Sequence, residues 1–68
     1  MHYIVLEIQK YDTIATLINS YDDRNDAYGK YYAVLSAAAT SKVPLHAASI
    51  LTEEGQAIEW KYFTHSED

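Results

Sequence analysis

The side chains that could carry acid–base or metal chemistry are three histidines and ten acidic residues, in a chain that has no cysteine. His2, His46 and His65 lack metal-ligand spacing, since none lies four residues from another histidine on a helix. We expect His46 and His65 on neighbouring strands, where either could pair with Glu59 as the base of a small hydrolase. No serine lies in a G-x-S-x-G nucleophile elbow, and ordinary strand histidines are the interpretation we favour. We therefore predict no enzyme, no bound metal and no cofactor.

A cluster of acidic residues at positions 22–26 has the composition of a calcium loop but not its spacing. An EF-hand loop needs oxygen ligands at its first, third and fifth positions and a glycine at the sixth. Counting from Asp22 puts Arg24 third, and counting from Asp23 puts Ala27 fifth. Acidic side chains also suit the first turn of a helix, because its free N–H groups and positive dipole end favour them. We predict a helix cap here.

Aromatic side chains are the unusual feature of the composition, with seven tyrosines, one tryptophan and one phenylalanine. They could form the core of a small protein, each tyrosine keeping its hydroxyl near the rim. They could instead form a binding surface, because tyrosine and tryptophan offer large, rigid contact area with a polar tip. Arginine and histidine would then add polar contacts. The candidate ligand- or partner-binding residues are Tyr3, Arg24, Tyr28, Tyr32, His46, Trp60, Tyr62 and His65.

Five periodic segments must position these residues. Residues 22–41 form the one long helical pattern, and Pro44 disfavours its continuation. Strand patterns occupy residues 2–9, 13–21, 45–52 and 56–65, with a turn at 53–55 where Gly55 can adopt positive φ, and a polar tail at 66–68. We predict an α+β fold of order β-β-α-β-β, with one helix packed on a four-stranded, mostly antiparallel sheet, in a single domain over residues 1–68.

The first strand separates into two faces. Ile4, Leu6 and Ile8 form a fully apolar face, which we assign to the core. The opposite face is mixed, and Tyr3 and Val5 on it would be exposed unless another element covers them. The second strand is apolar on both faces, so its register stays open, and this pattern favours a sheet covered on both sides.

The helix and the last strand each show a clear apolar pattern. One helical arc of about 160° is apolar or aromatic. It comprises Ala27, Tyr28, Tyr31, Tyr32, Val34, Leu35, Ala38 and Ala39. In the last strand, Ile58, Trp60 and Tyr62 alternate with charged residues, which is a half-buried pattern. One helix covers only one face of a sheet, and an apolar patch left over usually marks an interface. We predict a homodimer or higher oligomer, formed through the open sheet face or a sheet edge.

Size and charge restrict the partners. A chain of 68 residues buries only about 60% of its unfolded surface, and without cysteine it has no disulfide to stabilise it. Self-association is the remaining source of stability. The net charge of −5 makes a nucleic-acid partner unlikely, because five scattered basic residues neutralise few phosphates. No apolar run is long enough to span a membrane, and the N-terminus lacks the features of a signal peptide, so we expect a cytoplasmic protein.

The chain resembles a set of short, uncharacterised proteins of prophages and mobile elements of Gram-positive gut bacteria. The resemblance covers most of the chain and rests on Y-I-V-L-E-I-Q (3–9), A-T-L-I-N-S-Y-D-D-R-N-D-A (15–27), K-Y-Y-A-V-L-S-A-A-A-T-S-K-V-P-L-H-A (30–47) and L-T-E-E-G (51–55). It implies a mobile-element context, in which small acidic proteins often resemble inhibitors of host defence. No functional residue follows from it.

These observations favour a non-enzymatic, homo-oligomeric interaction module that binds a host or phage protein, as an inhibitor of host defence. The alternative is a small-ligand binding protein or sponge for a nucleotide-type molecule, with a tyrosine-lined pocket at a subunit interface.

Overall fold

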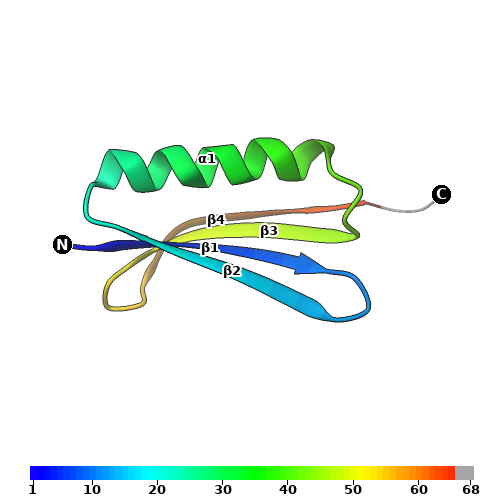
Figure 1. The fold of residues 1–68 in the computed structure, drawn as a ribbon, viewed down its shortest axis with the longest axis horizontal. Coiled ribbons are helices and arrows are strands. Elements are labelled where there is room, and N and C mark those ends of the chain that lie inside the picture. The colour runs from blue at the N-terminus through cyan, green and yellow to red at the C-terminus, as the bar shows by residue number, and fades with distance from the viewer. Residues whose placement is uncertain (66–68) are drawn as a thin grey trace.

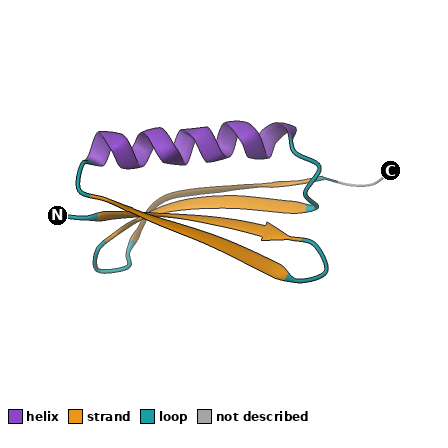
Figure 2. Cartoon of the chain, in the orientation of Figure 1, coloured by secondary structure: helices purple, strands orange, loops and turns teal. Residues whose placement is uncertain are grey.

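The computed structural model describes residues 1–65 and contains one helix and four strands (Figure 1). The elements are β1 (Tyr3–Lys10), β2 (Ile14–Tyr21), α1 (Arg24–Thr40), β3 (Leu45–Thr52) and β4 (Ala57–Thr64). Neighbouring strands are antiparallel, in the sheet order β2-β1-β3-β4. Helix α1 lies along one face of this sheet, and no other element of residues 1–65 lies over the opposite face (Figure 1, Figure 2).

The predicted α+β fold and its element order are confirmed. Predicted and observed element ends differ by at most two residues, since the helix predicted at 22–41 begins at Arg24 and ends at Thr40. Gly55 has a φ of 91° in the turn between β3 and β4, as its position predicted. The polar tail predicted at 66–68 lies outside the described residues.

Both ends of α1 are capped by side chains. Asp23 Oδ1 accepts a hydrogen bond from Asn25 N over 2.7 Å, which satisfies one free N–H group of the first turn. At the other end, Ser41 N donates to Ala38 O, and Ser41 Oγ donates to the same carbonyl over 3.2 Å. Pro44 follows and prevents a further turn. The interpretation of the acidic cluster as a helix cap is therefore confirmed.

Strand register shows which face of β1 the helix covers. Val5 is buried at 1% exposure, and it pairs with the buried Ile50 of β3 beneath α1. Side chains alternate along a strand, so Ile4, Leu6 and Ile8 face away from α1. The assignment of these three residues to the core is wrong. Alternation separates the two faces of a strand but does not say which face the helix covers. The Glu7 carboxylate on the helix side is accommodated by hydrogen bonds described below.

The core between α1 and the sheet is small. Its buried hydrophobic members among the described residues are Val5, Ala27, Tyr31, Val34, Ala38, Val43, Ala48 and Ile50. Tyr28 and Leu35 pack partly against this core. Tyr32 and Ala39, which the predicted helical arc included, are exposed. They lie at the far side of an arc of about 160°, which is wider than the stripe that a single sheet can cover.

Candidate interaction surface

The sheet face turned away from α1 is mostly apolar, with one charged residue, and we call it the open face. Its central strand contributes Ile4, Leu6 and Ile8, which are only partly exposed because their neighbours flank them. Register places apolar residues of the other strands beside them. The open face comprises Ile4, Leu6, Ile8, Ile14, Ile18, Leu45, Ala47, Leu51, Trp60 and Tyr62. An apolar surface of this extent is typical of an interface.

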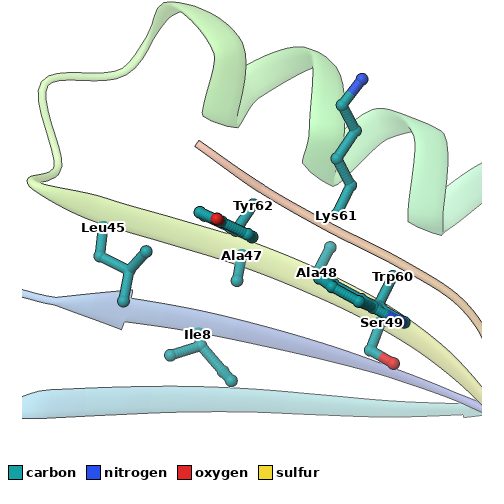
Figure 3. A pocket seen from close by; sticks show the side chains of 8 residues that line it. All are labelled: Ile8, Leu45, Ala47, Ala48, Ser49, Trp60, Lys61 and Tyr62. Atoms are coloured by element: carbon teal, nitrogen blue, oxygen red, sulfur yellow. The ribbon is translucent and has the colours of Figure 1, made fainter. Parts of the chain in front are cut away.

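Two aromatic rings cover the β3–β4 side of the open face. Trp60 and Tyr62 have ring centroids 6.3 Å apart and ring planes 6° from parallel. Their cross-strand partners are the small residues Ser49 and Ala47, which leave room for the rings to lie along β3 (Figure 3). A shallow groove of about 380 Å³ runs beside them, and Ile8 contributes to its lining. Trp60 remains 67% exposed and Tyr62 55% exposed.

Charge is nearly absent from the open face. Among the described residues that the register places on this face, only Lys10, at the end of β1, is charged. Glu7, Glu59 and Lys61 all lie on the helix side. The net charge of −5 is therefore carried elsewhere on the molecule. This distribution fits an apolar partner surface and does not fit a polyanion such as nucleic acid.

A second candidate cluster is buried beneath the C-terminal end of α1. Among residues 1–65, His46 is the only polar or charged residue that is buried. Its Nε2 donates to Glu7 Oε2 over 2.6 Å. Gln9 Nε2 donates to the same carboxylate oxygen over 3.0 Å. His46 Nδ1 lies 3.1 Å from Ser41 Oγ. Within residues 1–65, every buried side-chain nitrogen and oxygen has a hydrogen-bond partner.

The surroundings of Glu7 keep it ionised. Burial raises the pKa of its carboxyl, but hydrogen bonds from His46 and Gln9, with the charges of His46 and Lys30, outweigh burial and hold this pKa below its usual 4.5. The carboxylate therefore accepts hydrogen bonds throughout the neutral range. This explains how a glutamate can occupy the helix side of β1 while the apolar residues of that strand face outward.

The hydrogen-bond order Ser41–His46–Glu7 matches that of a nucleophilic triad, but the position of Ser41 does not suit catalysis. Its hydroxyl caps the helix and donates to Ala38 O. The C-terminal end of a helix carries partial negative charge, which opposes the oxyanion that such a reaction must stabilise. His65 Nε2 also donates to Ala38 O, over 2.9 Å. The cluster thus holds the helix end against β1, β3 and the end of β4.

The hydrolase alternative required a pair between Glu59 and a histidine. In the register of β3 with β4, His46 lies opposite Phe63, and Glu59 precedes Phe63 by four residues in β4. That separation is about 13 Å at the rise of a β-strand, beyond hydrogen-bond reach even through one water. The hypothesis of a Glu59–His46 site is therefore wrong, and His46 pairs with Glu7 instead.

The predicted site residues fall into three separate groups. Trp60 and Tyr62 lie together on the open face. His46 and His65 converge at the C-terminal end of α1 through Ser41 and the Ala38 carbonyl. The remaining residues, Tyr3, Arg24, Tyr28 and Tyr32, lie near the start of α1 or beside it. The eight candidate residues therefore do not form one continuous surface on a single chain.

The group at the start of α1 is held together by aromatic contacts. Arg24 lies over the ring of Tyr28 at 5.4 Å from the centroid. The rings of Tyr28 and Tyr32 have centroids 5.8 Å apart. Tyr3 instead packs against the core and is not available as a whole to a ligand. The structural interpretation of the aromatic residues thus holds for Tyr3 and Tyr31, and the surface interpretation fits Tyr32, Trp60 and Tyr62.

The sequence analysis missed Ile4, Leu6 and Ile8 as site candidates, because it placed these three residues in the core. The signal was present: Ile4, Leu6 and Ile8 form the cleanest apolar set in the chain. Glu7 and Ser41 were missed as well, since no local pattern links two residues that are 34 positions apart.

The chain matches no family model, no curated protein and no solved structure. In residues 1–65, no three histidine, aspartate or glutamate side chains are grouped closely enough to hold a metal ion. Helix α1 is too short and too polar to cross a membrane, and it is the one helix in the described part of the chain. A proposal of function must therefore rest on the geometry of the chain itself.

Proposed function

We propose that this chain is a non-enzymatic interaction module that associates with copies of itself through the open face. The observation that carries the proposal is the orientation of β1. Its fully apolar residues, Ile4, Leu6 and Ile8, face away from the only helix of residues 1–65. A single chain buries few large side chains, Val5 and Ile50 being the largest that are fully buried. A second copy would supply the core that the first lacks.

The size of the open face agrees with a second copy as its occupant. Four strands of eight residues, about 26 Å long and about 4.8 Å apart, give a footprint of about 500 Å². Two such faces bury about 1,000 Å² together, which is the lower threshold for a biological interface. The faces carry almost no charge, so two copies of this acidic chain can meet without repulsion at the contact.

A further partner, a host or phage protein, would meet the helix side of such an assembly. The aromatic group of Arg24, Tyr28 and the exposed Tyr32 stays accessible there. Asp22, Asp23 and Asp26 surround the same helix start, so a basic partner surface fits this region best. The role of an inhibitor of host defence rests on the resemblance to mobile-element proteins.

A small-ligand function is the second candidate, and the paired rings of Trp60 and Tyr62 favour it. Their nearly parallel rings beside the groove would accept a flat ring, as in a nucleotide-type molecule. Such a ligand would compete with self-association for the same face. A ligand at 100 times its dissociation constant adds about 2.7 kcal/mol to the free energy of unfolding. A thermal-shift screen with nucleotides tests this candidate, and the absence of any shift would count against it.

Light scattering across a range of concentration tests the first candidate. We expect a mass of at least twice the 7.7 kDa of one chain at micromolar concentration. Ile8→Asp should lower the mass, because it buries a charge in the proposed open-face interface. Ala33→Asp places the same charge on the exposed side of α1 and should leave the mass unchanged.

Circular dichroism checks that the Ile8→Asp chain is folded. If it is not, Ile8→Thr offers a milder change that keeps the β-branched shape. A wild-type mass of one chain at all concentrations would overturn the proposal, and so would a folded position-8 variant that assembles like the wild type.

A further inference from the structure

Strand β2 is an unprotected sheet edge. It pairs with β1 alone, so its outer backbone groups have no partner strand in residues 1–65. Residues 13–21 contain no charged residue, no proline and no glycine. Natural proteins usually block such an edge with charges, proline or a bulge, because an open edge invites pairing with another chain.

The opposite edge of the same sheet shows the protection that β2 lacks. Strand β4 carries Glu59 and Lys61 within the strand, and its register with β3 shifts between Ile50 and Leu51. An irregularity of this kind twists an edge away from a partner strand. The two edges therefore differ, and strand addition is favoured at β2.

Leu17 supplies an independent observation, because self-association through the open face does not cover it. It pairs with Glu7, which places it on the helix side of the sheet. Strand β2 slopes away from α1 toward the β1–β2 turn, so the helix leaves this side chain 52% exposed (Figure 1). Ile14 and Ile18, on the other side of the same strand, are 63% and 65% exposed. Apolar side chains are thus available on both sides of the edge.

We infer that the β2 edge is a second self-association site, where β2 of one copy pairs antiparallel with β2 of another across a two-fold axis. The inference rests on the proposed self-association but concerns a different surface. The occupant is a second copy because a neutral strand has no charge to select a basic or acidic partner, and two neutral copies do not repel. Two sheets of four strands would join into one continuous sheet.

Two-fold symmetry determines the arrangement of the strands. If nearly all of Ile14–Tyr21 is paired, the two-fold axis lies beside either Leu17 or Ile18. The residue at the axis then lies directly opposite the same residue of the second copy. Together with the open face, the edge gives each chain two isologous contacts. Two contacts of this kind close a tetramer of two large sheets packed face to face, with the helices outside.

Single-cysteine variants test the inference, because the natural chain has no thiol. Directly opposite residues of an antiparallel pair have Cα atoms about 4.5–5.5 Å apart, within the reach of a disulfide. We expect mild oxidation to produce covalent dimer from either Leu17→Cys or Ile18→Cys, but not from both. Ala15→Cys is the matched control on the same strand. Its two copies would be at least about 14 Å apart along the strands, too far to cross-link.

The inference would be overturned if neither Leu17→Cys nor Ile18→Cys formed a cross-link. Equal cross-linking of these two variants and Ala15→Cys would indicate random collision and would also overturn it. A cross-link confined to Ala15→Cys would also contradict it. Pairing of β2 with a strand of some other protein would leave both central variants reduced, and therefore falls among the contradicting outcomes.

The mass of two further variants separates this inference from the proposed function. Leu17→Lys should halve the assembled mass, since lysine on an edge strand opposes pairing. Glu59→Lys, on the edge strand β4 and on the helix side of the sheet, should not. If the edge contact is real and the open-face contact is not, Ile8→Asp will leave the cysteine cross-link and the mass unchanged. If only the open-face contact is real, Leu17→Lys will have no effect on mass.

Discussion

Glu7 and His46 join β1, β3 and the end of α1 at one buried point. The carboxylate accepts from His46 Nε2 and Gln9 Nε2, and the ring contacts the hydroxyl that caps the helix. A buried carboxylate is costly unless its hydrogen bonds are complete, and here each buried polar side-chain atom of residues 1–65 has a partner. These contacts allow Glu7 to lie on the helix side of β1, beside the buried Val5.

The lowered pKa of Glu7 predicts how stability depends on pH. Its folded-state pKa lies below the usual 4.5, so the ionised carboxylate stabilises the fold above about pH 4.5. This contribution is lost as the pH falls below 4.5 through the folded-state pKa. Glu7→Gln should lower the free energy of unfolding at neutral pH by about 1–3 kcal/mol and flatten its decline in acid.

Urea unfolding between acid and neutral pH measures both effects. Glu54→Gln, an exposed carboxylate in the β3–β4 turn, is the control and should follow the wild-type curve. An acid decline as steep in Glu7→Gln as in the wild type would contradict the role of this carboxylate.

At the scale of single elements, α1 depends on its N-terminal cap. Asp23→Ala should cost about 1 kcal/mol of folding free energy, because Asn25 N would lose its acceptor. The neighbouring Asp22 pairs with His2 and does not cap the helix, so Asp22→Ala should cost clearly less. Thermal unfolding of the two variants compares them directly, and equal losses would argue against the cap.

Substitutions of two adjacent residues of β1, Val5 and Leu6, test the assignment of its two faces to the core and to an interface. Val5→Ala removes buried atoms beneath α1 and should destabilise the single chain by about 1–3 kcal/mol. Leu6→Ala removes atoms from the open face and should instead weaken association, with a loss of stability that disappears on dilution. Chemical unfolding at two protein concentrations distinguishes these effects. A concentration-independent loss in Leu6→Ala would contradict the assignment of Leu6 to an interface.

The elements could be predicted from the sequence because each has a strong local pattern. Residues 45–52 were predicted to the residue, and the helix end followed from Pro44. The orientation of β1 could not be predicted from its own pattern, since Glu7 is accommodated on the helix side by a hydrogen bond from His46, 39 residues away. The candidate surface was therefore predicted only in part: Trp60 and Tyr62 were named as site residues, whereas Ile4, Leu6 and Ile8 were assigned to the core.

At the scale of the whole molecule, the described chain is a thin slab of 43 × 20 × 15 Å with a helix on one side only. The helix side carries the small core and most of the charge, whereas the open face carries apolar residues with almost none. This asymmetry is the physical basis of the proposal that the molecule works by association.

Trp60 provides the most direct measurement of that claim, because it is the only tryptophan of the chain and lies 67% exposed on the open face. Covering it with a second copy removes water from the indole, whereas pairing at the β2 edge leaves it exposed. We predict that its fluorescence emission moves to shorter wavelength as protein concentration rises, and that Ile8→Asp abolishes this change. Emission typical of a water-exposed indole at every concentration would contradict association through the open face.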